Sequence, residues 1–285
     1  MKEGKPMPNH TIFNERPESQ DRALKVIEKL GYTIVPRSEA EKKRGSRRDV
    51  LFTEELQSFL SHQTYQFGTE DRFFSGGSIA KAMQTVDLFS AAGLYAENKA
   101  IYELLCAGKS MEEDLPDGTR QSFDLSFIDF EHLENNTFQV TDEFEVERPN
   151  GKFARPDIVV LVNGIPLVVI ECKKSSVDVM EGVNQNIRNW GEDYIPHLFR
   201  YTQLVLAMNP DKVLYGTCGT PAKYFVSWHE DNKEWLNDWC RKCSPDGQIK
   251  EQDRALVSLL HPERLLDLIR NFIIYDNNVK KICRY

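Results

Sequence analysis

Asp157, Glu171 and Lys173 lie close together in the sequence and have the side chains that phosphodiester cleavage requires. Such cleavage usually depends on a hard cation held by carboxylates, which activates water and offsets the charge that builds on the phosphate. Asp157 opens one apolar run, Glu171 closes the next, and Lys173 follows two residues later. Because side chains alternate along a strand, Glu171 and Lys173 are expected on the same face. The pattern predicts a magnesium-dependent nuclease centre.

A purely structural interpretation of the same residues is that Glu171 pairs with Lys173 on a sheet edge, while Asp157 caps a turn after Pro156. Charged side chains at the ends of an otherwise apolar hairpin are partly desolvated, which is costly unless they are paired or bound to metal. For isolated residues the structural interpretation is the better one. The combination of all three favours the nuclease centre.

The two apolar runs, 157–162 and 166–173, are predicted strands joined through Asn163 and Gly164, a strong hairpin signal. A strict two-residue turn would place Asp157 and Glu171 on opposite faces of the hairpin. A three-residue loop that begins at 162, with Gly164 left-handed and a bulge, would restore the shared face. We predict this longer loop, or an equivalent bulge or bend.

The remaining elements follow from the period of the apolar residues and from turn signals. Helices are predicted over 19–30, 54–62, 79–89, 95–107 and 179–191, with a closing helix that begins at Pro262 and continues to 273. Strands are predicted over 32–35, 123–130, 137–147, 203–208, 213–215 and 224–228, with a surface loop over 110–120. The fold class is therefore α/β, a mixed central sheet flanked by helices and preceded by a helical N-terminal region. The predicted divisions are a helical region over 1–95, a core over 96–260 and a closing segment over 261–285.

The composition is that of an ordinary globular protein, with 285 residues, 40% of them hydrophobic and 28% charged. No apolar run approaches the roughly 20 residues that a membrane span needs. Residues 1–15 lack an export signal, and six thinly spread cysteines favour a reduced, cytoplasmic setting. Cys240 and Cys243 form a lone Cys-x-x-Cys without the second pair that a structural zinc site needs.

The formal net charge of −8 argues against coating nucleic acid by bulk electrostatics, so any contact with DNA must be local or shared with a partner. Two basic clusters are available for such contacts. They are Lys42, Lys43, Arg44, Arg47 and Arg48, and Lys152, Arg155, Lys173 and Lys174. The first cluster is open to two interpretations, a solvated loop or a phosphate-contacting one.

The stretch from Arg155-Pro156-Asp157 to Glu171-Cys172-Lys173 resembles the PD-(D/E)xK nuclease signature, and its flanks resemble the N-terminal region of type I restriction enzyme R subunits. The likeness includes Gln20-Asp21 and Asn184-Gln185-Asn186, and it extends over nearly the whole chain from about Glu18. It implies a restriction-endonuclease-like core.

The resemblance also implies a role for each matching residue. Asp157 and Glu171 would ligate Mg²⁺ together with the backbone carbonyl of Cys172, and Mn²⁺ could replace Mg²⁺. Lys173 would orient the attacking water or stabilise the phosphate charge. Gln185 matches the glutamine of a Gln-x-x-x-Tyr pattern in the family.

The chain departs from that pattern, because Asn189 stands in the tyrosine position and Trp190 follows it. Helical spacing predicts an apolar face of Met180, Val183, Ile187 and Trp190 and an opposite polar face of Glu181, Gln185, Arg188 and Glu192. Gln185 can therefore face either a cleft or solvent, while Trp190 is expected in the core. Glu97 and Glu103 resemble a supporting acidic residue of some nucleases in this superfamily, although their spacing is unspecific.

R subunits continue into motor domains that hydrolyse ATP and translocate DNA, and they act with modification and specificity subunits. This sequence has no Walker loop and ends after its closing helix, so we expect it to be a piece of a longer protein. The resemblance implies a Mg²⁺-dependent endonuclease domain that cuts double-stranded DNA, with ATP used only by motors outside this chain. Two alternatives are a non-catalytic DNA-binding or docking module that retains the nuclease fold, and a self-sufficient nuclease or resolvase.

Overall fold

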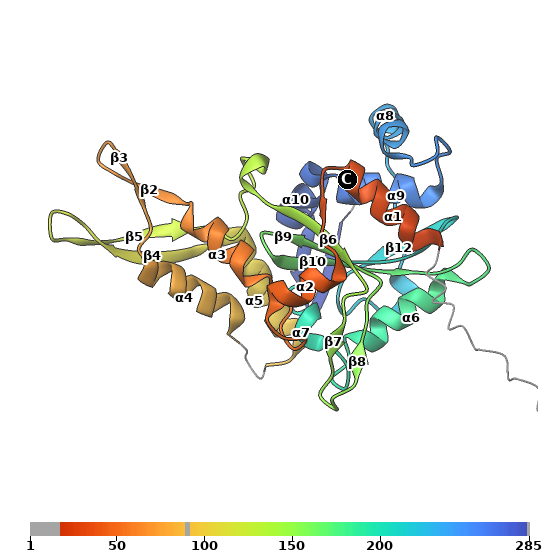
Figure 1. Ribbon diagram of the computed structural model, residues 1–285, viewed down its shortest axis with the longest axis horizontal. Coiled ribbons are helices and arrows are strands. Elements are labelled where there is room, and N and C mark those ends of the chain that lie inside the picture. The colour runs from red at the N-terminus through yellow and green to blue at the C-terminus, as the bar shows by residue number, and fades with distance from the viewer. Residues whose placement is uncertain (1–17, 89–91, 284–285) are drawn as a thin grey trace, which may run out of the picture.

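A six-stranded mixed sheet in the order β1-β6-β9-β10-β11-β12 lies at the centre of the fold (Figure 1). The strands are β1 (Thr33–Ile34), β6 (Phe138–Asp142), β9 (Ile158–Val162), β10 (Ile165–Cys172), β11 (Leu204–Asn209) and β12 (Lys212–Gly216). β1 runs parallel to β6 and β10 parallel to β11, whereas the other neighbours are antiparallel. Every residue of β9, β10 and β11 is buried, which explains their almost continuously apolar sequences.

This structure is a computed structural model, and it describes residues 18–88 and 92–283. The expectation for residues 1–15, the last residue of the predicted helix over 79–89 and the last two residues of the predicted closing segment lie outside the described residues. Within the described part of the chain, no helix is long and apolar enough to cross a membrane.

Helices flank the sheet and confirm the predicted α/β class. They are α1 (Glu18–Lys29), α2 (Arg37–Arg44), α3 (Thr53–Ser61), α4 (Gly76–Asp87), α5 (Leu94–Ala107), α6 (Val179–Asn189), α7 (Pro196–Phe199), α8 (Lys233–Cys243), α9 (Glu251–Leu260) and α10 (Pro262–Asn271), with 3-10 turns over Leu133–Asn135 and Ala222–Tyr224. α6 packs on β10 and β11, while α1 packs on β6 and α9, which in turn contacts β12. Since β1 belongs to the central sheet, the predicted helical N-terminal region also contributes a strand to the core.

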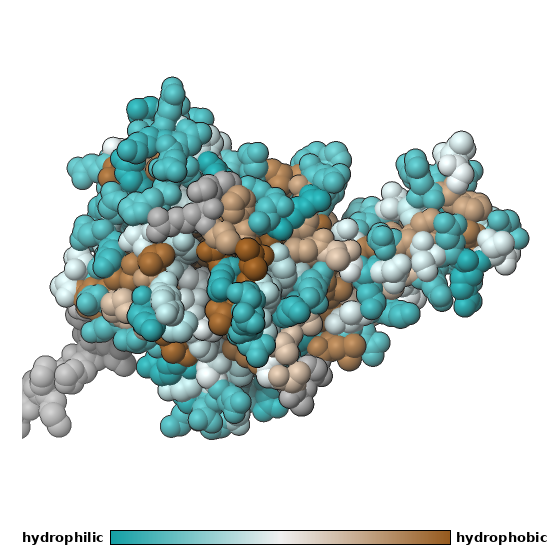
Figure 2. All heavy atoms as spheres, turned by 180° about the vertical axis from the view of Figure 1, so that it is seen from behind, coloured by the Kyte–Doolittle hydropathy of each residue, from teal (hydrophilic) through white to brown (hydrophobic). Residues whose placement is uncertain are grey.

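Two hairpins form an arm that projects from the body, as Figures 1 and 2 show from opposite sides. They are β2 (Thr64–Phe67) with β3 (Glu70–Phe73), and β4 (Lys109–Asp114) with β5 (Arg120–Leu125). The surface loop predicted over 110–120 is therefore right only for residues 115–119, which join the two strands, and wrong for the residues of β4 and β5. Met111 and Glu113 both point inward from β4, and Glu113 accepts hydrogen bonds from the backbone N–H and hydroxyl of Ser75. Because the inward-facing Glu113 is charged, the alternation of apolar and polar residues that would have predicted the strand is not visible in the sequence.

Two short hairpins complete the fold, β7 (Val146–Glu147) with β8 (Phe153–Ala154), and β13 (Ile273–Asp276) with β14 (Val279–Ile282). The closing helix was predicted to continue to 273, but α10 ends at Asn271 and the chain turns back at Asn277 and Asn278, both with positive φ. The strand predicted over 224–228 is reduced to one isolated bridge between Tyr215 and Val226.

The first basic cluster lies on and after α2, where most of its charges have acidic partners. Lys43 pairs with Glu55, Arg47 with Glu145 and Arg48 with Glu147. Arg44 is buried, with its guanidinium 4.0 Å from the centre of the Phe144 ring, and it donates to the Glu145 carbonyl oxygen. The cluster is therefore neither a plain solvated loop nor a free cationic patch.

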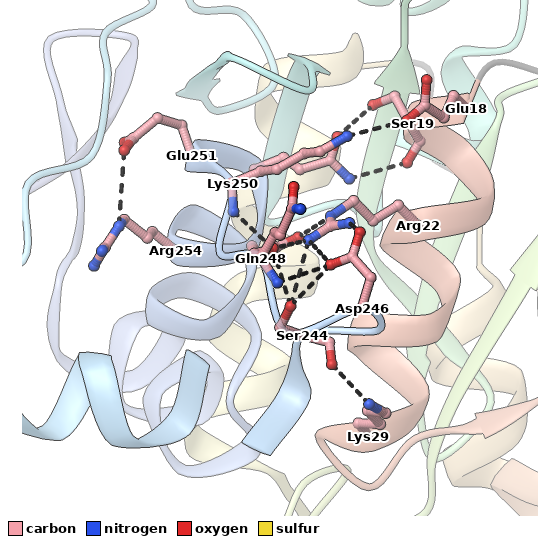
Figure 3. A network of polar contacts seen from close by, with 12 residues as sticks. Glu18, Ser19, Arg22, Lys29, Ser244, Asp246, Gln248, Lys250, Glu251 and Arg254 are labelled. Carbon is pink, nitrogen blue, oxygen red and sulfur yellow. Dashed lines mark hydrogen bonds and ion pairs between the residues drawn. The ribbon is translucent and has the colours of Figure 1, made fainter. Parts of the chain in front are cut away.

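The polar network in Figure 3 joins α1 to residues 244–254, which include the start of α9. Both ends of the Asp253 carboxylate accept from Arg22, at 2.8 and 2.7 Å, and Asp246 accepts from the same guanidinium at 2.8 Å. Ser19 and Gln252 exchange hydrogen bonds of 3.0 and 3.2 Å. These contacts fix the N-terminal half of α1, which carries Gln20, against residues 246–253.

Candidate active site

The turn between β9 and β10 decides whether the two carboxylates meet. Asn163 and Gly164 both have positive φ and close a two-residue turn, so the predicted three-residue loop is wrong. The register then shifts between Pro166 and Val168, which makes Leu167 the extra residue of a bulge. Beyond the bulge Ile170 pairs with Ile158, and continuing the register places Glu171 opposite Asp157. The shared face is thus restored by a bulge, the equivalent arrangement that the sequence allowed.

The turn itself is fixed by buried contacts. Asn163 donates to the Phe127 carbonyl oxygen at 3.0 Å and accepts from the Thr137 backbone N–H at 2.8 Å. Gly164 accepts from the Phe52 backbone N–H at 2.9 Å, and a Cβ added to it would lie 2.3 Å from the Phe52 carbonyl oxygen. Only glycine fits that position, both for its φ of 77° and for this close approach.

Backbone directions at the end of β10 bring one amide group to Asp157. The Lys173 N–H donates to the Met208 carbonyl of β11 at 2.7 Å, so the preceding residue, Cys172, presents its amide groups to the other side. There the Cys172 N–H donates to Asp157 Oδ2 at 2.7 Å. In an extended strand the N–H and C=O of one residue point the same way, so the Cys172 carbonyl also faces the Asp157 side.

The two carboxylates differ in burial and in partners. Glu171 is fully buried, and its Oε1 accepts from Asn189 Nδ2 at 3.2 Å. Its Oε2 has no hydrogen-bond partner among the residues that the structure describes, and Lys173 Nζ lies 3.9 Å from it. Burial, and then the neighbouring charge of Asp157, raise the pKa of Glu171 well above its usual value. Burial also raises the pKa of Asp157, although the Cys172 N–H opposes that change.

This set of oxygens fits a hard cation. A carboxylate oxygen that is buried and unpartnered, a second carboxylate and a backbone carbonyl are ligands of the kind that Mg²⁺ prefers. Over residues 18–88 and 92–283 no three His, Cys, Asp or Glu side chains gather into a metal-binding group. The remaining positions would therefore fall to water or substrate, which suits Mg²⁺ because it usually keeps several waters.

Lys173 and Gln185 meet at the cleft beside the carboxylates, where Lys173 Nζ donates to Gln185 Oε1 at 2.7 Å. Of the two orientations that the sequence left open, Gln185 therefore adopts the one toward the cleft. The residues lining this cleft are Arg155, Asp157, Cys172, Lys173, Lys174, Val177, Glu181, Asn184, Gln185 and Arg188. Cations outnumber carboxylates along it, so the cleft is locally basic in a chain of net charge −8.

Other candidates from the sequence lie elsewhere. Trp190 is half-buried and packs edge-on against Phe199 with ring centres 5.8 Å apart, so it lies at the border of the core in which it was predicted. Glu97 is buried with its carboxylate 4.0 Å from Arg200, and Glu103 is exposed with its carboxylate 3.4 Å from Lys99. Neither glutamate lines the cleft of Asp157.

Two polar side chains that touch the site were not proposed from the sequence as site residues. Asn189 contacts Glu171, and Gln20 donates from Nε2 to the Asp157 carbonyl oxygen at 3.0 Å. The apolar face predicted for the helix after the hairpin was partly wrong, because its fully buried side is Val179, Gly182, Val183, Asn186 and Asn189. The only signal for Gln20 was its presence in the Gln20-Asp21 likeness.

The fold and site define an α/β protein in which a bulged hairpin brings two acidic side chains and a lysine to the edge of a basic cleft. The chain belongs to the family described as type I restriction enzyme R protein N terminus, whose model matches residues 12–224. It is 28% identical over 287 residues to the type I restriction enzyme HindI endonuclease subunit of Haemophilus influenzae. It is 27% identical over 288 residues to the putative type I restriction enzyme MjaIXP endonuclease subunit of Methanocaldococcus jannaschii. These matches cover 96% and 95% of this chain and 26% of each relative, so the chain spans about a quarter of their length.

Proposed function

We propose that this chain is the Mg²⁺-dependent endonuclease domain of a type I restriction-modification R subunit and hydrolyses phosphodiester bonds of double-stranded DNA. The observation that carries the proposal is the fully buried Glu171 at the edge of a basic cleft, beside Asp157. One of its oxygens has no hydrogen-bond partner in the part of the chain that the structure describes. Burying neighbouring carboxylates is costly unless a positive charge compensates them. The names of the relatives, endonuclease subunits, support the same function.

Asp157, Glu171 and the Cys172 carbonyl are the groups that would hold the ion. When bound, Mg²⁺ lowers the pKa of a bound water and offsets negative charge on the phosphate. Lys173 has one of its three N–H donors fixed by Gln185, which orients the ammonium group. Its other donors are available to the attacking water or to a phosphate oxygen.

Substrate binding would depend on the cleft rather than on the whole chain. Arg155, Lys174 and Arg188 line it and can contact phosphates on either side of the cleaved bond. A local group of cations can attract DNA even when the net charge of the chain is negative. In the full-length protein we propose that cleavage is coupled to ATP-dependent translocation by domains outside this chain, and that modification and specificity subunits are its partners.

The first test is a crystal soaked in Mn²⁺, with anomalous density expected between Asp157 and Glu171. If that density is absent and both carboxylates keep the contacts described above, the non-catalytic docking module becomes the better interpretation. In solution, Lys173→Ala is expected to reduce cleavage by about 10²- to 10³-fold, the usual effect of losing one donor to the transition state. Lys174→Ala is the matched control, because it removes a cation from the same cleft but should weaken DNA binding rather than abolish cleavage.

A further inference from the structure

We infer that Asn189 is a positioning residue that holds Glu171 so that one carboxylate oxygen is left free for the cation; this rests on the proposed function. Asn189 Nδ2 donates to Glu171 Oε1 at 3.2 Å, and both residues are buried, with exposed fractions of 2% and 0%. The other oxygen of Glu171 has no hydrogen-bond partner within the described residues. One donor on one oxygen fixes the plane of the carboxylate without occupying the second oxygen.

The position of Asn189 is set by the way in which α6 lies on the sheet. Gly182 lets the helix approach closely, since a Cβ there would be 3.1 Å from Ala207 Cβ and 3.5 Å from Glu171 Cβ. One turn further on, Asn186 Nδ2 donates to the Leu206 carbonyl oxygen at 3.0 Å. Asn189 comes next on the same face, because residues four and seven positions along a helix lie above one another. The helix thus contacts β11 through Gly182 and Asn186, and it contacts Glu171 of β10 through Gly182 and Asn189.

An amide suits this position because it is a neutral donor. A lysine or arginine beside Glu171 would neutralise the carboxylate and compete with the cation, whereas an amide N–H leaves its charge in place. The ammonium group of Lys173 lies farther from Glu171 than from Gln185. Lys173 Nζ is 3.9 Å from Glu171 Oε2 but only 2.7 Å from Gln185 Oε1. Two polar side chains of α6 therefore hold Glu171 and Lys173 separately. Asn189 binds the carboxylate of Glu171, and Gln185 binds the ammonium group of Lys173.

The test compares Asn189→Leu with Asn186→Leu in the whole chain, by titration with Mn²⁺ followed by electron paramagnetic resonance. Both substitutions remove a buried amide from the same helix face, so both should lower the melting temperature. Only Asn189→Leu is expected to weaken Mn²⁺ binding, by about 10- to 100-fold, the usual effect of losing an outer partner of a metal ligand. Asn186→Leu is expected to stay within about threefold of the original chain, since its amide bonds a strand carbonyl and not a ligand.

The outcomes separate this inference from the proposed function. If the original chain binds no Mn²⁺, or if Glu171→Gln leaves Mn²⁺ binding unchanged, the metal site itself is refuted. If Glu171→Gln abolishes binding but Asn189→Leu retains the original affinity, the positioning role is overturned and the metal site stands. Should Asn189→Leu fail to fold, Asn189→Ala removes the same donor without adding bulk, and the same comparison is made with Asn186→Ala.

Discussion

Replacing Glu171 with glutamine is expected to stabilise the metal-free chain at neutral pH. Glutamine has nearly the same shape and can still accept from Asn189, but it carries no charge. In the folded chain, burial and the charge of Asp157 raise the pKa of Glu171, and each unit of such a rise costs about 1.4 kcal/mol of stability once the group is ionised. We therefore expect Glu171→Gln to raise the free energy of unfolding at pH 8, by about 1.4 kcal/mol for each pKa unit that separates the folded from the unfolded chain once the group is ionised.

The pH dependence of this gain has a definite sign. The folded pKa of Glu171 lies above the unfolded value, so between the two the folded chain holds a proton that the unfolded chain has released. Stability therefore falls as the pH rises from about 4.5 through the folded pKa, and it stays lowered above it. The glutamine variant has no carboxyl group at position 171 and therefore does not lose stability in this way as the pH rises. The difference between the two proteins should be small near pH 4 and should grow as the pH rises toward the folded pKa of Glu171.

Calorimetric melting in EDTA at pH 4 and pH 8 measures the difference directly. A gain of 1 kcal/mol corresponds to about 2–4 °C in melting temperature for a domain of this size range. Adding Mn²⁺ should narrow the difference. A cation at 100 times its dissociation constant stabilises the original chain by about 2.7 kcal/mol, whereas the variant has lost a ligand and binds the cation more weakly. Glu181→Gln, which removes an exposed carboxylate from the same cleft, is the control and should change stability by less than about 0.5 kcal/mol at either pH. The reasoning is refuted if Glu171→Gln melts lower than the original chain in EDTA at pH 8, or if its gain is the same at both pH values.

Three further substitutions test how the site is supported. Arg22→Ala should cost about 3–5 kcal/mol in urea unfolding, because it leaves the buried Asp253 carboxylate without its cation; a loss below 1 kcal/mol would contradict this. Gly164→Ala should cost at least about 1–2 kcal/mol from its left-handed backbone alone, plus the clash with the Phe52 carbonyl, and an unchanged urea midpoint would show that the turn can relax. Arg48→Ala should change stability by less than about 0.5 kcal/mol, because its contact with Glu147 is exposed. It should also leave the salt dependence of DNA binding unchanged. If the affinity of the variant for DNA depended less steeply on salt concentration, Arg48 would have to be assigned to the DNA-binding surface.

The central hairpin could be predicted from the sequence because its signals are local. A run of strand formers, a turn of asparagine and glycine, and charges at both ends were enough to place Asp157 and Glu171 on neighbouring strands. The bulge at Leu167 could be expected only in general terms, since its position depends on how β10 packs between β9 and β11. Because side chains alternate along a strand, a shared face for Asp157 and Glu171 required an irregularity in the hairpin, but the sequence did not indicate its position.

Three of the other misses share one physical cause, which is polar residues that face inward. Glu113 on β4, and Asn186 and Asn189 on α6, are buried because each has a specific hydrogen-bond partner far away in the sequence. A pattern of apolar and polar residues assigns such side chains to the surface. Gln20 was missed as a site residue for the same reason, since its partner is the backbone of Asp157.

The fastening of α1 to α9 has a consequence for how the protein is made. A ribosome releases the chain from the N-terminus at about 5–20 residues per second, so roughly 10 to 50 s pass between the appearance of Arg22 and that of its partner Asp253. During that interval α1 has no α9 to pack on, and the segment that carries Gln20 lacks the contacts that hold it to residues 246–253. A newly made chain therefore completes the surroundings of its carboxylates only after Asp253 has been synthesised.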